Sequence, residues 1–196
     1  MFYETALNNH GLPLDPFKAI VGPRPIGWIS TLSTSGVANL APYSFFNAFS
    51  EDPYYLGFGS GGYKDSLQNI VDSREFAVNI VSHDLREAMN NSSTSARGDE
   101  FEFAGLEKAQ CHLIKSPRVA ASPASLECVL FQVIGLPSSS GAIRDHLVIG
   151  KVVGIHIADK FIENGRVNSA AMKPVLRMGY SEYATVESSW RMRRPG

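Results

Sequence analysis

Apolar and polar positions alternate along several short segments of the chain, which predicts β-strands. The clearest alternation covers residues 75–81, where Phe76, Val78 and Ile80 share one face. This period of two is typical of a strand with two different faces. The other predicted strands cover residues 26–34, 53–58, 126–136, 147–157 and 177–186.

Helical patterns are few and short. Residues 66–73 place Leu67, Ile70 and Val71 on one face, with Asp65 as the predicted N-cap. Residues 83–90 form a second predicted helix, and no internal repeat is visible. The pattern favours an antiparallel barrel or sandwich with short helices over an alternating βαβ sheet.

The segment from Pro23 to Asn47 has the least regular pattern. On its predicted strand Trp28 and Ser30 share one face, and the other face also mixes an apolar residue with a hydroxyl. A plain core strand would segregate these groups. We expect a loop to leave the sheet further along and to present groups suited to a flat, hydrogen-bonding ligand. The residues of that loop are Ser44, Phe45, Phe46 and Asn47.

Length and charge limit the possible functions. The 196 residues are predicted to form one domain, 1–196, with an N-terminal arm over 1–22 and a basic tail over 187–196. The net charge of −1 gives no overall attraction to nucleic acid. Charged residues make up 19% of the chain, below the usual ~25%, which indicates a surface buried in an oligomer.

The sequence contains no sign of export, membrane insertion or metal binding. Its first residues lack the basic start and apolar run of a signal peptide, and no window approaches the ~18 apolar residues of a membrane span. Cys111 and Cys128 do not form a disulfide framework, so we expect a reduced, cytoplasmic protein. Cys111 and His112 would point to opposite faces of a strand, and no other pair has ligand spacing.

The glycine cluster Gly57-Phe-Gly-Ser-Gly-Gly62 lies between a predicted strand and a predicted helix. It matches Gly-x-Gly-x-x-Gly, so a Rossmann-type NAD-dependent dehydrogenase is one alternative. Three residues separate the glycines from the helix and no further βαβ units follow, which argues against this alternative. A second interpretation is a phosphate site, with Ser60, Lys64 and Ser66 near the free N–H groups of the helix start. A plain turn is the third.

Asp145 and His146 precede the predicted strand over 147–157. Adjacent residues at a strand end could both reach the edge of a ligand, and histidine titrates most readily near neutral pH. A half-exposed histidine in a turn is the alternative. Gly-x-Ser-x-Gly is absent, so a Ser-His-Asp hydrolase would lack its nucleophile turn.

Several motifs carry a resemblance to a known family. Pro23-Arg-Pro-Ile-Gly-Trp-Ile-Ser-Thr31 is followed by Asn39-Leu-Ala-Pro-Tyr-Ser-Phe-Phe-Asn47, then by Lys64-Asp-Ser66 and Asn69-Ile70. Further blocks lie at 99–106, 117–128, 145–150 and 177–183. Together, over residues 14–186, they resemble the flavin reductase-like family. The resemblance implies a mainly β, antiparallel, Greek-key FMN-binding split β-barrel with a few short helices.

The resemblance also implies a function and its partners. It implies a homodimer with FMN between the subunits and NADH or NADPH as hydride donor, which is an NAD(P)H:flavin reductase. A flavin-dependent monooxygenase could then take the reduced FMN. An FMN-binding electron carrier without productive NAD(P)H oxidation is the second function that the sequence leaves open. The candidate cofactor-binding residues are Trp28, Ser30, Thr31, Ser44, Phe46, Asn47, Ser60, Lys64, Asp65 and Ser66.

One departure from the family pattern concerns the hydride donor. The family has glycine before Asp-His, whereas this chain has Arg144. Arg144, Asp145 and His146 are the candidate nicotinamide-binding residues, and His146 is the candidate catalytic residue. An arginine at this position either clamps a phosphate of the dinucleotide or blocks the site.

Overall fold

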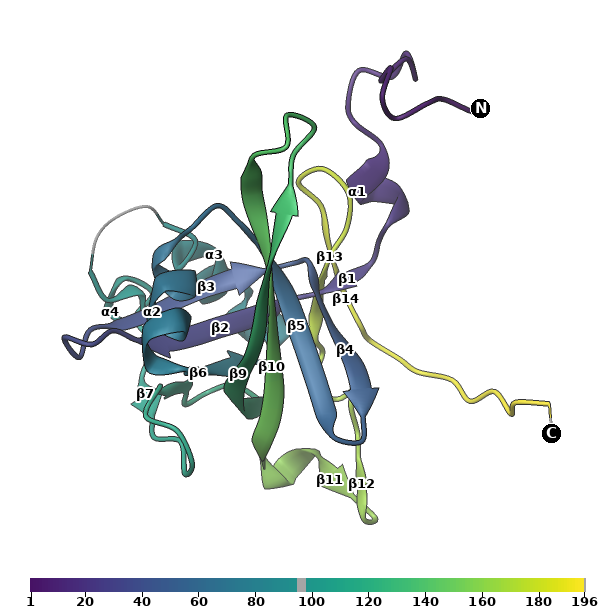
Figure 1. Cartoon of the computed structure of the whole chain (residues 1–196). Helices are drawn as coiled ribbons and strands as arrows, with labels where there is room; N and C mark the ends of the chain where they lie inside the picture. The colour runs from purple at the N-terminus through teal and green to yellow at the C-terminus, as the bar shows by residue number, and fades with distance from the viewer. Residues whose placement is uncertain (95–97, 196) are drawn as a thin grey trace.

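The computed structural model describes residues 1–94 and 98–195 (Figure 1). Its largest sheet has seven antiparallel strands in the order β3-β2-β6-β9-β10-β5-β4. These strands are β2 (Gly27–Leu32), β3 (Ala38–Tyr43), β4 (Phe46–Glu51), β5 (Tyr54–Gly61), β6 (Glu75–Asn79), β9 (Ala124–Pro137) and β10 (Ile143–Ile157). The prediction of a mainly β, antiparallel fold is confirmed.

The long hairpin of β9 and β10 joins the two halves of this sheet. β9 pairs with β6 on one side, and β10 pairs with β5 on the other. Three register shifts interrupt the β9–β10 ladder, and such irregularities increase the local twist of a sheet. In Figure 1, β2, β3 and β6 therefore lie to one side of the hairpin and β4 and β5 to the other.

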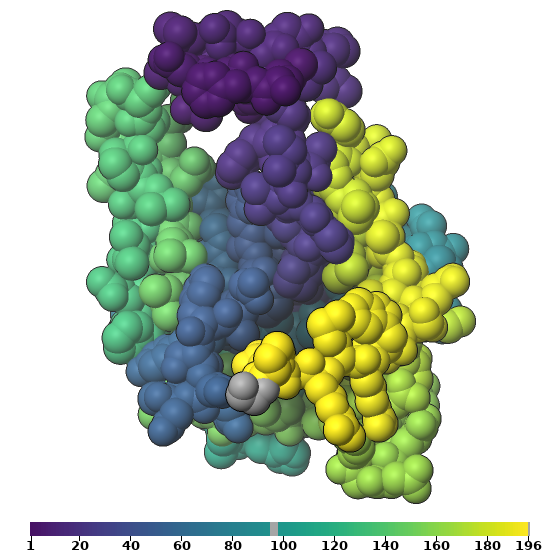
Figure 2. Space-filling model, turned by 90° about the vertical axis from the view of Figure 1, so that its right-hand side faces the viewer, coloured from purple at the N-terminus to yellow at the C-terminus, as the bar shows by residue number. Residues whose placement is uncertain are grey.

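A second, three-stranded sheet joins the two ends of the chain. Its strands are β1 (Arg24–Pro25), β13 (Val175–Arg177) and β14 (Tyr183–Thr185), in the order β1-β13-β14. In the space-filling view, the N-terminal segment leading into β1 lies beside the C-terminal segment, while the first residues stand away from the body (Figure 2).

The remaining elements are short. The helices are α1 (Phe17–Ile20), α2 (Asp65–Ser73), α3 (Arg86–Asn91), α4 (Glu100–Phe103) and the 3-10 turns η1 (His83–Leu85) and η2 (Asp159–Phe161). Two small hairpins pair β7 (Lys108–Ala109) with β8 (Arg118–Val119) and β11 (Ile162–Glu163) with β12 (Arg166–Val167). Within the two described ranges, no helix has the length and apolarity needed to cross a membrane.

Both faces of β2 are buried, in two different hydrophobic clusters. Ile29 packs in a cluster that includes Leu67 of α2. Trp28, on the opposite face, packs in a cluster with Met89 of α3 and Phe101 of α4. Because each face of the strand meets its own layer of helices, neither face shows the polar pattern of a solvated surface.

Two details of the fold differ from the sequence prediction. Ser44 and Phe45 connect β3 to β4 as expected of a loop, but Phe46 and Asn47 already belong to β4. β3 is an edge strand, and an edge tolerates the missing N–H of Pro42. The predicted N-cap is also wrong, because Asp65 is the first residue of α2 and Lys64 is the N-cap, without a side-chain cap hydrogen bond.

Candidate functional site

A cavity of about 670 Å³ opens between β3, β5 and the start of α2. Its volume lies within the range of roughly 300–1,000 Å³ that is typical of ligand pockets. Gly59 and Gly61 of β5 form part of its wall, so this side carries no side chain that would narrow it. The lining residues are Asn39, Ala41, Pro42, Tyr43, Ser44, Phe45, Gly59, Gly61, Lys64, Asp65, Ser66, Ser92, Ser93, Thr94 and Glu100.

One end of the cavity is built to attract an anion. The first turn of α2 lies there and has no side-chain cap, so its free N–H groups face an opening that Lys64 and Ser66 also line. Asp65 lines the same opening, and its carboxylate opposes an anion in part. Of the phosphate site predicted from Ser60, Lys64 and Ser66, Lys64 and Ser66 line this end and Ser60 does not.

A buried hydrogen-bond network positions the floor of this end. Ser66 Oγ donates to Asn39 Oδ1 over 2.6 Å, and Asn69 Nδ2 donates to Thr31 Oγ1 over 3.0 Å. Thr31 Oγ1 in turn lies 3.5 Å from Asn39 Oδ1. The amide of Asn39 is held from two sides, which presents it to the cavity in one orientation.

Tyr43 and Glu100 place two buried acids in the cavity wall. Burial raises the pKa of Tyr43, although hydrogen bonds with Ser66 and Ser60 oppose this rise. Burial also raises the pKa of Glu100, while hydrogen bonds such as that from the Leu40 N–H to Oε2 lower it in part. In both groups burial disfavours the charged form, and the neighbouring hydrogen bonds offset this effect in part.

Four of the predicted cofactor contacts lie behind the cavity wall. Trp28, Ser30, Thr31 and Ser60 have 0% exposed surface, so a ligand in the cavity has no atom of theirs to touch. We therefore revise their predicted role from direct contact to support of the wall. Ser60 Oγ donates to the Gly62 carbonyl at 3.1 Å and so holds the turn that leads to Lys64.

On the opposite face of β2, Trp28 supports the cavity wall directly, whereas Ser30 acts only by fixing the strand in place. Trp28 Nε1 donates to Ser92 Oγ over 2.9 Å, and Ser92 lines the cavity. Ser30 Oγ donates to the Pro117 carbonyl and accepts a hydrogen bond from Asn79 Nδ2. The hydroxyl and indole groups that made the β2 pattern unusual thus satisfy buried partners.

Ser44, Phe46 and Asn47 line a groove that adjoins the other end of the cavity. Ser44 and Phe45 border both spaces, whereas Phe46 and Asn47 line only the groove. The groove has a volume of about 590 Å³ and a partly apolar wall that includes Leu147. The structure thus places the predicted residues Ser44, Lys64, Asp65 and Ser66 around one cavity and leaves Phe46 and Asn47 beside it.

The candidate nicotinamide-binding residues lie near the start of β10, and the side chains of Asp145 and His146 point to different faces of the sheet. Asp145 is paired with Gly61 and His146 with Ser60, so Asp145 shares the face of the cavity and His146 the opposite face. The His146 ring makes a T-shaped contact with Tyr63 at 5.6 Å, and its Nδ1 is buried without a hydrogen-bond partner. Arg144 is exposed. The fold therefore does not bring these three side chains together.

Several residues that line the cavity were not predicted as cofactor contacts from the sequence. Asn39 and Tyr43 lie within the motif Asn39–Asn47, and their amide and phenol groups could have indicated ligand contacts. Glu100 and Ser92 come from segments whose approach to β3 only the tertiary structure shows. Phe45, which borders both the cavity and the groove, lies in the expected ligand loop but was not among the predicted cofactor contacts.

The fold also gathers three potential metal ligands that the sequence did not indicate. Ligand atoms of Cys111, Glu127 and His156 lie within 4.8 Å of one another. However, Glu127 accepts hydrogen bonds from the N–H groups of residues 112–114, and His156 Nε2 lies 2.6 Å from its Oε1. Both carboxylate oxygens of Glu127 thus hold residues 112–114 in place, and we interpret the cluster as structural.

Comparison with known proteins places these features in a family. The sequence profile described as "Flavin reductase like domain" matches residues 22–173, which include β2 to β5 and α2. The chain belongs to the flavin reductase-like family. This assignment confirms the resemblance drawn from its motifs.

Solved structures are similar to this flavin reductase-like chain over most of its length. Nitrilotriacetate monooxygenase component B from Bacillus cereus is 27% identical, with 98% of each chain covered and a TM-score of 0.87. The 2-nitrobenzoate 2-nitroreductase of Pseudomonas fluorescens is 29% identical, covers 91% of this chain and 88% of its own, and has a TM-score of 0.82. A split barrel domain protein of Shewanella frigidimarina, 20% identical over 98% and 94% with a TM-score of 0.83, shows the fold.

The split-barrel fold excludes the Rossmann interpretation of the glycine cluster. Gly57, Gly59 and Gly61 lie inside β5, which pairs antiparallel with β4 and β10. A Cβ at Gly57 would lie 2.6 Å from the Val148 carbonyl oxygen and 2.7 Å from the Phe49 ring. These glycines therefore permit close packing within a sheet and do not form a dinucleotide-binding turn.

Proposed function

We propose that this flavin reductase-like chain binds FMN in the cavity and transfers hydride to it from NADH or NADPH. The observation that carries the proposal is the uncapped start of α2, with Lys64 and Ser66, at one end of a 670 Å³ cavity. A single anion site is what a mononucleotide needs. Bound FMN would supply the redox chemistry, as an acceptor of hydride.

The residues of this chain would bind and orient the flavin. Lys64, Ser66 and the N–H groups of α2 would hold its phosphate. Asn39, fixed by Thr31 and Ser66, would offer its amide to the polar part of the flavin. Ser44 and Phe45, which follow the C-terminal end of β3, would border the flavin ring. The edge strand β3 beside them would limit the access of water to the ring.

A homodimer belongs to the proposal, with FMN at or near the interface. The β9–β10 hairpin exposes Phe131, Ile143 and Ile155 by 55%, 60% and 54%, and β4 exposes Phe49 by 56%. These residues are spread along connected strands, because β9 pairs with β10 and β5 joins β10 to β4, and exposed apolar residues along such strands favour an interaction surface. A second copy of the chain would cover them, in agreement with the low content of charged residues.

The proposal extends to the partner and the cellular location. A structural neighbour is a monooxygenase component B, and this supports a flavin-dependent monooxygenase as the consumer of reduced FMN. Both cysteines, Cys111 and Cys128, are free thiols, which agrees with a reducing, cytoplasmic environment.

Anaerobic mixing tests the proposal directly. Purified protein is loaded with FMN, and NADH or NADPH is added while flavin absorbance near its visible maximum is followed. Bleaching at a rate that saturates with the nucleotide supports the reductase. FMN binding without bleaching by either nucleotide would instead favour the electron carrier, and failure to bind FMN would refute the proposed cavity.

A further inference from the structure

A second cavity, of about 270 Å³, adjoins the proposed flavin cavity. The two share Pro42, Ser44 and Ser93 in their walls. The second cavity lies between the N-terminal segment and the sheet of β1, β13 and β14, the region where the two ends of the chain meet in Figure 2. Its lining residues are Lys18, Arg24, Ile26, Pro42, Ser44, Met89, Ser93, Arg177, Tyr180 and Tyr183.

The charge of this cavity is one-sided. Lys18, Arg24 and Arg177 line it, and no carboxylate does among the residues that the structure describes. None of the three takes part in an ion pair in residues 1–94 or 98–195. Three cations thus converge in a chain whose net charge is −1.

Arg24 is buried, with 7% exposed surface, and its hydrogen bonds in the described part of the chain go to carbonyl oxygens. Its guanidinium donates to the carbonyl oxygens of Lys18, Val21 and Met178, which tie the N-terminal segment to the C-terminal one. Its Nε is buried without a hydrogen-bond partner. Carbonyls satisfy N–H groups but do not neutralise the positive charge, so an anion beside Arg24 would be stabilised.

The cations lie against the ring that borders the flavin cavity. Lys18 Nζ lies 6.0 Å and the Arg24 guanidinium carbon 5.7 Å from the centroid of Phe45. Arg177 stacks on Tyr183, with 4.3 Å between the guanidinium carbon and the ring centroid. A planar ligand with an anionic group would meet both aromatic and cationic partners here.

This cavity lies at the opposite end of the flavin cavity from the phosphate site. Ser66 contacts Asn39 on β3, whereas the shared residue Ser44 is five residues further along the chain. Five extended residues span roughly 16 Å at about 3.3 Å per residue. An anion at Lys18, Arg24 and Arg177 therefore need not be the flavin phosphate.

We propose that this second cavity binds the anionic group, a phosphate or a carboxylate, of the molecule that exchanges electrons with the flavin. The inference rests on the proposed function, because it takes the first cavity as the flavin site. A phosphate would come from the dinucleotide donor, and a carboxylate from an aromatic acid that accepts electrons. Each is an oxyanion with two oxygens that the two parallel N–H groups of an arginine can bind.

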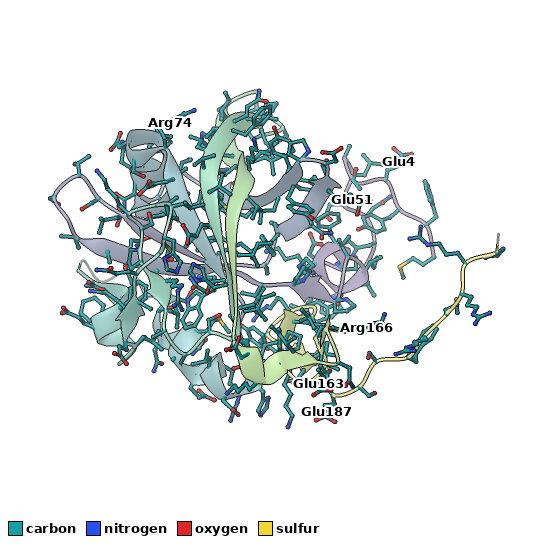
Figure 3. The ribbon with its side chains drawn as sticks, turned by 90° about the horizontal axis from the view of Figure 1, so that it is seen from below. Glu4, Glu51, Arg74, Glu163, Arg166 and Glu187 are labelled. Atoms are coloured by element: carbon teal, nitrogen blue, oxygen red, sulfur yellow. The ribbon has the colours of Figure 1, made fainter. Side chains whose placement is uncertain are left out.

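Binding of simple anions to the FMN-loaded protein tests the proposal. Inorganic phosphate and benzoate are titrated separately by calorimetry into the wild type and into Lys18→Gln and Arg177→Gln. We expect at least one anion to bind, and each substitution to weaken its binding about tenfold. Phosphate binding alone would point to the donor, and benzoate binding alone to an aromatic acid acceptor. Lys160→Gln and Arg166→Gln remove matched cations outside this cavity and should leave anion binding unchanged; Arg166 lies on β12, near Glu163 (Figure 3).

The design separates failure of this inference from failure of the proposed function. FMN affinity is measured first, by quenching of flavin fluorescence, and should change less than twofold in Lys18→Gln and Arg177→Gln. If the wild type binds FMN but neither anion, the proposal that the second cavity binds an anion is refuted, and the proposed flavin site is not affected. Loss of FMN in either variant, with an unchanged melting temperature, would assign these cations to the flavin phosphate and also overturn it. Absence of FMN binding in the wild type would refute the proposed function itself.

Discussion

Replacement of Lys64 by alanine examines the phosphate end of the flavin cavity. Lys64 is the N-cap of α2 and lines the cavity beside Ser66. The substitution removes a cation but leaves the N–H groups of the first helical turn and the Ser66 hydroxyl in place. It should therefore weaken FMN binding without abolishing it.

The size of the effect follows from the surroundings of Lys64. A hydrogen bond to a charged partner contributes about 1.5–3 kcal/mol, or roughly 10- to 150-fold in affinity. Lys64 is exposed, and solvent and salt weaken its field, so we expect the lower limit, about tenfold. Asp65 lines the same end with the opposite charge, and Asp65→Asn should tighten FMN binding by a few-fold.

Quenching of flavin fluorescence measures both affinities at a fixed ionic strength. Lys160→Ala serves as the control, because Lys160 lies in η2 and outside the cavity lining. The effect of Lys64→Ala should shrink as salt is raised, since it is electrostatic. An FMN affinity equal to the wild type in Lys64→Ala, or a looser one in Asp65→Asn, would refute the phosphate site at α2.

Two further predictions concern the scaffold. Gly57→Ala should lower the free energy of unfolding by about 1–3 kcal/mol, because the new Cβ would overlap the Val148 carbonyl and the Phe49 ring; chemical denaturation measures this. The control is Gly61→Ala on the same strand, where the new Cβ would make only an ordinary contact, 3.6 Å from Asp145 Oδ1, and a loss in Gly57→Ala no larger than in this control would contradict the packing argument. For Glu127, burial raises the pKa, but hydrogen bonds from the His112 and Leu113 N–H groups and from His156 outweigh it and leave the pKa below 4.5. The stabilisation that the Glu127 carboxylate gives to the folded state is then complete above about pH 4.5 and is lost as pH falls through the lowered folded pKa. The variant Glu127→Gln should therefore be less stable than the wild type at pH 7, and its stability should depend less on acid. An acid-unfolding profile parallel to that of the wild type would refute this structural role of Glu127.

Local patterns in the sequence determined much of the architecture. The alternation over residues 75–81 and the apolar runs near 126–136 and 147–157 correspond to β6, β9 and β10. The short amphipathic pattern of residues 66–73 corresponds to α2. These signals are reliable because each reports the two faces of one element, which depend on neighbours close in sequence. The motifs likewise indicated Lys64 and Ser66 beside the helix start.

Only the tertiary structure decided what the unusual β2 pattern means. Its hydroxyl and indole groups suggested ligand contacts, but α2 covers one face of the strand and α3 and α4 cover the other. Trp28, Ser30 and Thr31 therefore have no exposed surface, and their side chains are hydrogen-bonded to Ser92, Pro117 and Asn39 respectively. A strand pattern shows which residues share a face but not which layer will cover that face, because covering layers come from distant segments.

The same reason explains the residues that the sequence could not bring together. Glu100 reaches the cavity through α4, and Lys18, Arg24 and Arg177 converge because β1 pairs with β13. Arg24 is hydrogen-bonded to Met178, 154 positions away along the chain. No periodicity or local spacing encodes such a contact. This contact forms when burial of apolar surface brings the two ends of the chain into one sheet. The same pairing gathers the three cations that line the second cavity.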